Sequence, residues 1–461
     1  MFLSNFGHRI IALAFATALI AASIPAQAEP DESDEVSVEE AATSAQDAAA
    51  NETSDETTTN TGGTDSAAAG DPEKKPDSKQ DAASSDDTTP STDEAAKAKP
   101  EPDAAKPDKL TVASWGGAYG ESQRRAYFAP FQNESGIAIE AVSHNGKFDA
   151  LDPEKSDKPA WDVIDVSAHA IDQACRDGWL EKVDTAVLSA AEDGTKARDD
   201  FFPDSLHECG VPSVAWSSAI VFDKRAFKKR APKTAKDFFD VKRFPGKRAL
   251  PEGMKYTLEL ALLADGVDPD DVYKELATDE GVARALKQLD AIRDHIVWWT
   301  RGSEPLSMLE EQQATMAVAF NGRIFSAIVA ETKPFGIIWD GQVFDVDLWA
   351  IPKGTPNVKS ALDFIAFATR PTQLAQQAGW FPYGPMRKSA VELVGRHPEV
   401  DVDMSAFIPT SKSNFERALR LDTGWWQKNE DRMTERFKVW KIGDGGSAES
   451  GADVESENAS R

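Results

Sequence analysis

The sequence has only two cysteines, little positive charge and no apolar run long enough to span a membrane. Two cysteines in 461 residues exclude a disulfide-dense scaffold, and a membrane-spanning helix needs about 20 apolar residues in a row. Lys and Arg number 51 against 78 Asp and Glu, which gives a net charge of −27. A nucleic-acid binder would need a basic surface. The charge balance therefore argues against that class and is compatible with a cationic partner.

Aromatic residues are absent from a long acidic segment. Residues 29–107 contain no Phe, Trp or Tyr, and they hold 22 Asp and Glu against six Lys. Such a segment cannot bury enough apolar surface to offset its ordering entropy, so we predict a disordered, extended linker. It would reach toward a surface or act as a solubilising bristle, and the simplest interpretation is a spacer without a specific partner. The acidic tail at 442–461 is predicted to be disordered as well.

The first 28 residues have the pattern of a secretory signal. Arg9 supplies the positive charge, and Ile10 to Ala22 form an apolar run broken only by Thr17. Ala26-Gln27-Ala28 then fits the small-x-small cleavage pattern. The run is shorter than the about 20 residues that a membrane span needs. We therefore predict cleavage after Ala28 and export, most simply to a bacterial periplasm.

Only residues 108–441, which hold all twelve Trp, can bury a core. Predicted strands at 109–115, 137–142 and 161–167 alternate with helical stretches, and a similar alternation restarts after residue 223. This pattern is typical of an α/β fold whose sheet is covered on both faces.

Two long strand-like passages, 210–223 and 343–351, join these two α/β patterns. They predict two lobes linked by a hinge, with the second lobe inserted into the first. The predicted first lobe comprises 108–217 and 346–441, and the second comprises 218–345. A cleft between two such lobes is a common ligand site, and hinge closure around a ligand is a known binding mode.

Cys175 and Cys209 are the only cysteines of a chain predicted to be exported, so we expect a disulfide between them. The loop of about 34 residues would make it worth about 4 kcal/mol in the chain-entropy model. His169 and His207 lie near the two cysteines, so a Cys₂His₂ zinc site is an alternative. The spacing lacks a zinc signature, and we predict no metal.

Sequence motifs for catalysis are missing. The sequence contains no G-x-S-x-G, H-E-x-x-H or G-x-x-x-x-G-K-[ST]. We predict that the protein is not an enzyme and uses no cofactor. Two alternatives of another class stay open: an exported hydrolase that uses carboxylates for acid–base work, and an envelope interaction protein without a ligand.

The folded part resembles a known family. It contains, in order, LTVASWGGAYGESQRRAYFAPF, WDVIDVS, ECGVPSVAWSSAIVFD, DFFDVKRFPGKR, AFNGRIF and VDLWAIPKG. Together these segments resemble the periplasmic solute-binding proteins of polyamine (spermidine/putrescine) ABC transporters, which are family 1 extracellular solute-binding proteins. The resemblance implies a two-lobed periplasmic-binding-protein fold of type II with two crossover strands. It also implies a monomer that captures a small solute for an inner-membrane permease, without catalysis.

The resemblance also implies a ligand site, and proteins of this family place cysteines at positions 175 and 209. The matching positions are Trp115, Tyr119, Ser167, Glu252, Asn321, Asp345, Asp347, Tyr383 and Gln427. Carboxylates would bind the ammonium groups of an amine, and aromatic faces would contact its chain through cation–π attraction. Without the resemblance, Trp115 would be read as a core residue and Glu252 as a turn residue.

Two positions depart from the best-known polyamine binders. Asp345 stands where those proteins have Trp, and Phe320 replaces the Trp of a Trp-Asn-Gly segment. Asp345 and Asp347 alternate along a strand and so share one face, which favours a cation site. A different amine or an amino acid is therefore compatible with the pattern.

A rival within the binding-protein class is an amino carboxylate such as γ-aminobutyrate. Helices that begin after Gly116-Gly117 and after Gly253 would direct their N-termini, which favour anions, at the cleft. Arg323, next to Asn321-Gly322, would bind a carboxylate.

Overall fold

The computed structural model describes residues 106–146, 151–152 and 158–443. The predicted signal peptide, nearly all of the acidic linker and most of the acidic tail lie outside these residues. The predictions about them therefore stay predictions. Among the described residues, none of the helices combines the length and the hydropathy that crossing a bilayer requires.

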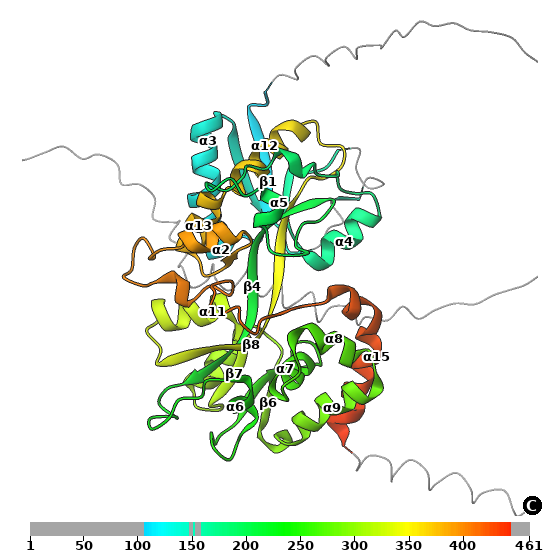
Figure 1. The fold of residues 1–461 in the computed structure, drawn as a ribbon, viewed down its shortest axis with the longest axis vertical. Helices are drawn as coiled ribbons and strands as arrows, with labels where there is room; N and C mark the ends of the chain where they lie inside the picture. Colours follow the sequence, from blue (N-terminus) through cyan, green and yellow to red (C-terminus); the bar gives the residue numbers. More distant parts are fainter. Residues whose placement is uncertain (1–105, 147–150, 153–157, 444–461) are drawn as a thin grey trace, which may run out of the picture. The chain divides into compact units, whose positions relative to one another are not determined.

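Ten strands form one mixed sheet (Figure 1). The path through it runs β2-β1-β3-β8-β4-β7-β5-β6, while β9 pairs with β4 and β10 with β8. The strands are β1 (Lys109–Ser114), β2 (Ala138–Ser143), β3 (Val163–Ser167), β4 (Gly210–Asp223), β5 (Arg248–Pro251), β6 (Ile296–Trp299), β7 (Met316–Phe320), β8 (Phe335–Ala350), β9 (Gly384–Pro385) and β10 (Leu419–Arg420).

Helices connect and cover these strands. The α-helices are α2 (Gly117–Gln123), α3 (Ala129–Ser135), α4 (Ala168–Arg176), α5 (Ala197–Asp200), α6 (Ala235–Phe239), α7 (Thr257–Ala264), α8 (Val272–Leu276), α9 (Asp279–Asp290), α10 (Glu304–Glu310), α11 (Asn321–Phe325), α12 (Val358–Ala368), α13 (Pro371–Trp380), α14 (Lys388–Leu393) and α15 (Thr423–Ile442). A π-helical turn, η1 (Arg124–Phe128), joins α2 to α3. A second one, η6 (Ser326–Ala330), extends α11.

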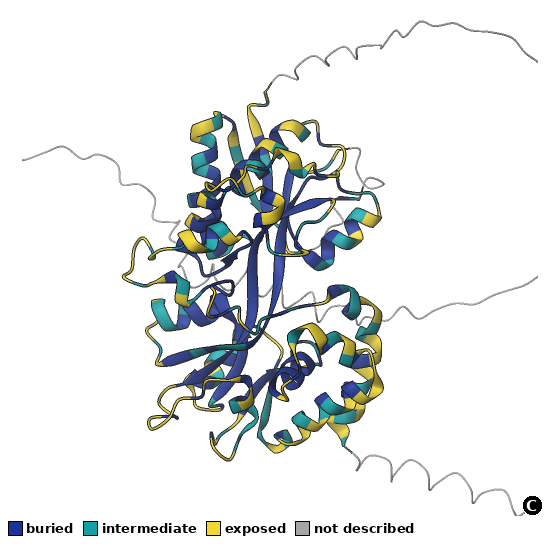
Figure 2. Cartoon of the chain, in the orientation of Figure 1, coloured by how far each residue is buried: buried dark blue, intermediate teal, exposed yellow. Residues whose placement is uncertain are grey.

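The two predicted crossover passages are the two longest strands. β4 and β8 run antiparallel beside each other, and every residue of β4 is buried (Figure 2). β8 begins at Phe335, eight residues before the predicted start. Its first residues pair with the end of β4, for example Phe335 with Asp223, because a strand shared by two lobes needs partners in both.

The fold confirms the predicted α/β class with two lobes. Strand β1 is parallel to β2 and β3, and strand β5 is parallel to β6 and β7. Buried apolar residues form two clusters. One includes Leu110, Val163 and Phe364, and the other includes Leu260 and Ala285. Each group of parallel strands therefore has its own core, while β4 and β8 pass from one to the other.

The C-terminal helix α15 packs on helices and strands of the second lobe. Phe437 and Trp440 contact the ring of Trp298 on β6. The indole nitrogen of Trp440 donates a hydrogen bond to Asp290 at the end of α9. The predicted lobe boundaries place α15 with the first lobe, and they stay predictions. The ring contacts and hydrogen bond named here join the C-terminal end of this helix to the second lobe.

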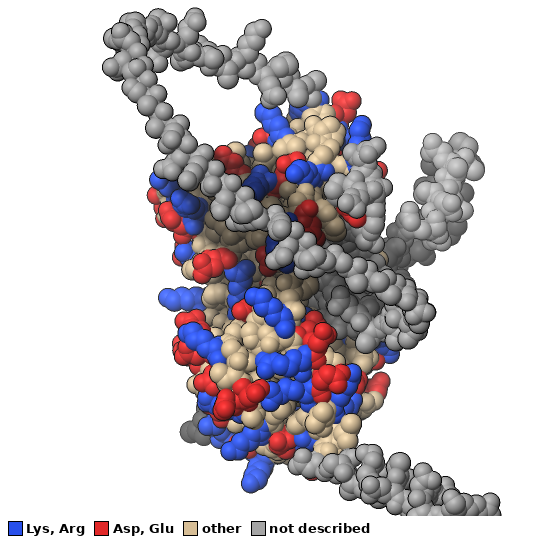
Figure 3. All heavy atoms as spheres, turned by 90° about the vertical axis from the view of Figure 1, so that its right-hand side faces the viewer, with Lys and Arg blue, Asp and Glu red and all other residues tan. Residues whose placement is uncertain are grey.

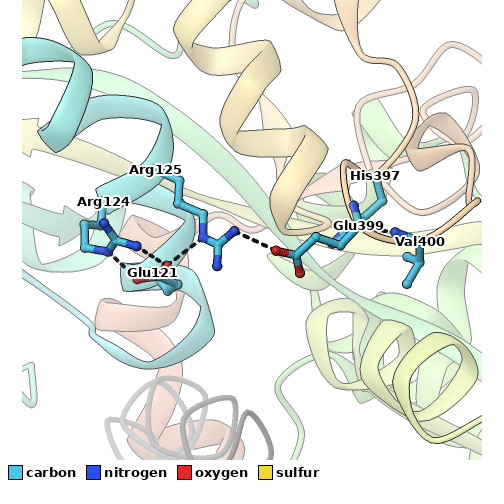
Figure 4. Close-up of polar contacts among 6 residues, drawn as sticks. All are labelled: Glu121, Arg124, Arg125, His397, Glu399 and Val400. Atoms are coloured by element: carbon cyan, nitrogen blue, oxygen red, sulfur yellow. Dashed lines mark hydrogen bonds and ion pairs between the residues drawn. The ribbon is translucent and has the colours of Figure 1, made fainter. Parts of the chain in front are cut away.

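A chain of charges fixes the irregular segment that follows α14 (Figure 4). Glu121 accepts from both Arg124 and Arg125, and Arg125 also donates to Glu399 at 2.8 Å. His397 is held in the same segment, where its Nδ1 accepts from the backbone nitrogens of Glu399 and Val400. These contacts attach the segment to the end of α2.

Candidate functional site

Asp345 and Asp347 lie where the pairing of β4 with β8 is irregular. The register shifts on either side of them, between Pro212 and Val214 and again between Ser218 and Ile220. Such bulges bend and twist a strand pair and redirect its side chains. Asp347 lies opposite Val214 on one side and opposite Ser167 of β3 on the other. The predicted residues Ser167, Asp345 and Asp347 are therefore brought together.

Both carboxylates are buried, with 4% and 3% of Asp345 and Asp347 exposed. Asp345 accepts a hydrogen bond from the backbone nitrogen of Val346 at 2.8 Å. Burial raises the pKa of Asp345 from 3.8 to about 6, against the lowering effect of that hydrogen bond and of the charges on Arg420 and Lys255. Buried carboxylates are costly unless they are hydrogen-bonded or paired.

Trp216 connects the acids to an aromatic group. It lies opposite Asp345 on β4, and its Nε1 donates to Oδ1 of Asp347 at 3.2 Å. Its ring packs edge-on against Phe320, with centroids 5.6 Å apart. Phe320 in turn contacts Tyr256 and Trp299. These rings form an aromatic wall on the second-lobe side of the acids.

A second aromatic group comes from the first lobe. Tyr119 and Tyr383 pack with ring centroids 4.9 Å apart, and Trp115 packs on His144 at 4.5 Å. Burial raises the pKa of Tyr119 well above its usual value, and the charges of Asp165 and Asp347 raise it further. Tyr119 is therefore within electrostatic reach of Asp347. Three predicted aromatic residues, Trp115, Tyr119 and Tyr383, share one apolar cluster with Trp216 and Phe320.

Several buried polar atoms of this site lack a hydrogen-bond partner among the described residues. They include Nε1 of Trp115 and Oγ of Ser167, in side chains that are 6% and 5% exposed. Ser167 is also the residue before α4, and its hydroxyl does not cap that helix. Buried polar groups are normally satisfied, so both atoms are suited to contacting a polar ligand.

Asn321 positions a loop of the site. Its Oδ1 accepts from the backbone nitrogen of Ser217 at 3.0 Å, and its Nδ2 donates to the carbonyl of Pro382 at 2.7 Å. The amide thus joins β4 to the loop that carries Tyr383. The resemblance predicted a ligand contact here, and the structure shows both ends of the amide engaged by backbone.

Two of the residues predicted to bind the ligand make contacts elsewhere. Glu252 is exposed and pairs with Lys441 at the end of α15. Gln427 is exposed on α15, with its Nε2 3.4 Å from Nδ1 of His169. Their ligand roles stay predictions.

Arg323 and the Phe320 ring both border Gly302. Arg323 is buried on α11, and a Cβ placed on Gly302 would lie 3.3 Å from its Nε and 3.5 Å from Phe320. Glycine at 302 leaves the room that this guanidinium occupies. A buried guanidinium is suited to binding a carboxylate.

The sequence-based prediction missed two contributors. Trp216 lies in a crossover passage of mostly small and β-branched residues, and its size there was the available signal. Asp165 is wholly buried and accepts from Ser114 and Gln123, at 3.0 and 2.7 Å. Burial raises its pKa from 3.8 to about 6. This network supports the strand ends from which Trp115 and Ser167 extend.

The two cysteines form the predicted disulfide, with Cα atoms 5.9 Å apart. His207 lies beside it, and its Nε2 is 3.2 Å from Asp172. Ligand atoms of Cys175, His207 and Cys209 lie within 4.8 Å of one another. Zinc binding requires thiolates, which the disulfide removes, so the geometry favours the disulfide over the zinc alternative.

Comparisons with known proteins identify a family. Residues 126–406 match the model of the bacterial extracellular solute-binding proteins. A γ-aminobutyric acid-binding protein of Pseudomonas aeruginosa is 37% identical over 73% of this chain and 92% of its own length. A spermidine/putrescine-binding periplasmic protein of Salmonella typhimurium is 24% identical, over 59% of this chain and 73% of that protein.

Solved structures give the same fold. An ABC transporter substrate-binding protein from Bradyrhizobium japonicum is 30% identical, with a TM-score of 0.60 over 72% of this chain and 99% of that one. A structure of a GABA receptor is 28% identical, with a TM-score of 0.58 over 72% of this chain and 97% of that one. Both similarities extend over nearly the whole of the other chain.

Proposed function

This chain belongs to the bacterial extracellular solute-binding proteins, the substrate-binding components of ABC transporters, and we propose that its solute is a short ω-amino carboxylate such as γ-aminobutyrate. The observation that carries the proposal is the presence of buried charges of both signs near one aromatic ring pair. Asp347 accepts a hydrogen bond from Trp216, whose ring packs on Phe320. The buried Arg323 and Phe320 both border Gly302.

An ω-amino carboxylate matches this arrangement. Its ammonium group pairs with Asp347 and Asp345, which offsets the cost of burying those charges. Its carboxylate accepts hydrogen bonds from the guanidinium of Arg323. The methylenes between them lie against the rings of Trp216 and Phe320. Trp115 Nε1 and Ser167 Oγ supply further donors from the first lobe.

A polyamine fits less well, although the sequence resemblance first indicated one. Its second ammonium group would face Arg323, and like charges in a buried site repel. The spermidine/putrescine binder among the relatives is also the more distant, at 24% identity, whereas the γ-aminobutyric acid-binding relative is 37% identical. Both considerations favour the amino carboxylate.

The transport role completes the proposal. We infer an exported monomer that closes its two lobes on the solute and delivers it to an inner-membrane permease, without chemical change to the solute. The recorded contact between Gln427 and His169 joins α15 to the start of α4. The crossover strands β4 and β8 carry the acids, so closure and ligand contact involve the same strands.

The test compares four solutes that differ in their charged ends: γ-aminobutyrate, putrescine, butylamine and butyrate. A ligand that binds only the folded state stabilises it by RT ln(1 + [L]/Kd), about 4 kcal/mol at 1,000 times Kd. We expect a large rise in melting temperature with γ-aminobutyrate and little with the three others. A larger rise with putrescine would contradict the proposal and restore the polyamine assignment.

Two variants test which residues bind the ammonium and carboxylate ends of the ligand. Asp347→Asn should remove the shift caused by γ-aminobutyrate, because the ammonium loses its partner. Arg323→Gln should also remove that shift and should improve binding of butylamine or putrescine relative to γ-aminobutyrate. An Arg323→Gln protein that keeps full affinity for γ-aminobutyrate would show that the carboxylate binds elsewhere.

A further inference from the structure

One stretch of the second lobe is strongly basic although the chain as a whole is acidic. From Asp223 to Arg248 the chain carries eleven Lys and Arg against three Asp. Ten of these cations are exposed, and six of the ten form what we call the basic face: Lys228, Lys229, Arg230, Lys233, Lys236 and Lys242. The ion pairs recorded in this stretch are those of Arg225 and Arg243. None of the six has one with another described residue.

Packing holds the two halves of the basic face together. The stretch comprises α6 and the turns on either side of it, green in Figure 1. Phe227, from the turn before α6, packs edge-on against Phe244, from the turn after it, with centroids 5.7 Å apart. The buried Arg248 donates to the carbonyls of Phe238 and Gly246 at 2.6 and 2.8 Å. The turns on either side of α6 are therefore packed against each other.

The surface that bears α9 and α15 is different. Figure 3 shows Lys and Arg intermixed with Asp and Glu over this side of the molecule. Arg432 and Arg436 of α15 both face Asp279 of α9. Charges there neutralise one another within the fold. On the basic face they do not, and clustered like charges of this kind attract a polyanion.

The complementary polyanion is present in the same chain. Residues 29–73 hold fourteen Asp and Glu and no Lys or Arg. A flexible chain of the length of residues 29–105 has an end-to-end distance of about 50 Å, enough to reach distant parts of the surface. Because it is tethered, its effective concentration at the domain surface is on the order of millimolar. A separate partner would have to compete with that concentration.

We propose that the acidic segment 29–105 docks on the basic face of its own chain. The interaction is electrostatic, without a fixed register, since the segment has no aromatic residue to anchor it. It neutralises the face and is weakened by salt, because the Debye length falls from about 8 Å at 0.15 M to about 3 Å at 1 M. The proposal is independent of which solute the protein binds.

The test uses the full mature chain and measures its radius of gyration by small-angle X-ray scattering. The variant carries Lys228→Gln, Lys229→Gln, Lys233→Gln and Lys236→Gln. A matched control carries the same change at four exposed lysines elsewhere, Lys196, Lys287, Lys412 and Lys428. We expect a larger radius in the first variant and in 1 M salt, and a wild-type radius in the control. An unchanged radius in the first variant, or an equal change in both, would overturn the proposal.

A second measurement identifies the occupant. Carbodiimide joins carboxylates to amines in contact, and mass spectrometry locates the links. We expect intramolecular links from residues 29–105 to Lys228, Lys229 and Lys233, lost in 1 M salt. Links mainly between different molecules would instead show that the acidic segment of a second copy occupies the basic face. Salt-sensitive binding to phosphatidylglycerol vesicles that requires the basic face, without intramolecular links, would show that the face binds a membrane. Either of these two results overturns the docking proposal.

Discussion

The indole nitrogen of Trp216 donates a hydrogen bond to Asp347, and the two residues belong to different crossover strands. They are separated by 131 positions in the sequence. This bond orients the carboxylate and fixes the ring against Phe320. The acid and the aromatic wall of the site therefore depend on each other.

The Trp216–Asp347 bond can be removed with little change in packing. Trp216→Phe keeps a ring at the site and deletes the donor. Hydrogen bonds to charged groups are worth about 1.5–3 kcal/mol, so we expect the affinity for γ-aminobutyrate, measured by calorimetry, to fall about tenfold or more. Trp216→Ala should weaken binding further. If Trp216→Phe bound as tightly as the wild type, the indole nitrogen would have no part in orienting Asp347.

The buried Asp345 predicts an unusual pH dependence of stability. Its pKa is raised to about 6 in the fold from an ordinary 3.8, so the folded state holds its proton more tightly than the unfolded state. The stability that this group contributes is therefore present at low pH and is lost as pH rises through 6. Each pKa unit corresponds to about 1.4 kcal/mol, which sets an upper limit of about 3 kcal/mol for this group.

Asp345→Asn tests that dependence in the ligand-free protein. We expect the variant to be more stable than the wild type in urea at pH 7.5, and the difference to shrink at pH 5. Asp363→Asn, at an exposed position paired with Lys359, is the control and should show no such trend. A variant that is less stable than the wild type at pH 7.5 would mean that the Asp345 carboxylate has a stabilising partner.

The disulfide gives a third prediction. It closes a loop of 34 residues, for which the chain-entropy model gives about 4 kcal/mol. The double variant Cys175→Ser/Cys209→Ser should lose stability of that order in urea unfolding. Dithiothreitol should lower the stability of the wild type and leave the double variant unchanged. Equal sensitivity of both proteins to the reductant would show that the disulfide does not stabilise the fold.

A buried ion pair in the first lobe gives a fourth prediction. Arg387 Nε donates to Asp200 at 2.6 Å, and both side chains are buried. Removing one partner leaves an uncompensated charge, which costs about 3–5 kcal/mol. Arg387→Met should therefore destabilise strongly, and Asp200→Asn in addition should restore part of the loss. Lys359→Met, which breaks the exposed pair with Asp363, should cost less than about 1 kcal/mol.

Local patterns in the sequence were enough to predict much of the fold. The apolar runs at β3 and β7, with every residue buried, and the long passages at β4 and β8 can be recognised before any tertiary contact is known. The two lobes and their crossover strands follow from the order of these elements. The start of β8 was missed because Phe335 to Ile338 belong to the strand through their pairing with the end of β4, which local pattern does not reveal.

The structure brings several of the predicted site residues near one another, namely Trp115, Tyr119, Ser167, Asp347 and Tyr383. Their ligand roles stay predictions. Glu252 is instead recorded with Lys441, because α15 returns to the second lobe and brings its last turn beside that residue. The role of Asn321 as a link between β4 and the loop at Pro382 also depends on chain segments far apart in sequence.

The sequence by itself determined the composition of the parts: an acidic segment without aromatics, a domain with all the tryptophans, and strands set by apolar pattern. Tertiary structure alone decided which charges meet. Antiparallel pairing of β4 with β8, offset by two bulges, places Trp216 beside Asp347 and buries both acids. The physical reason is that the free-energy cost of a charged side chain depends on how deeply it is buried and on which groups contact it, rather than on residue type. Both are fixed only when strands distant in sequence pair.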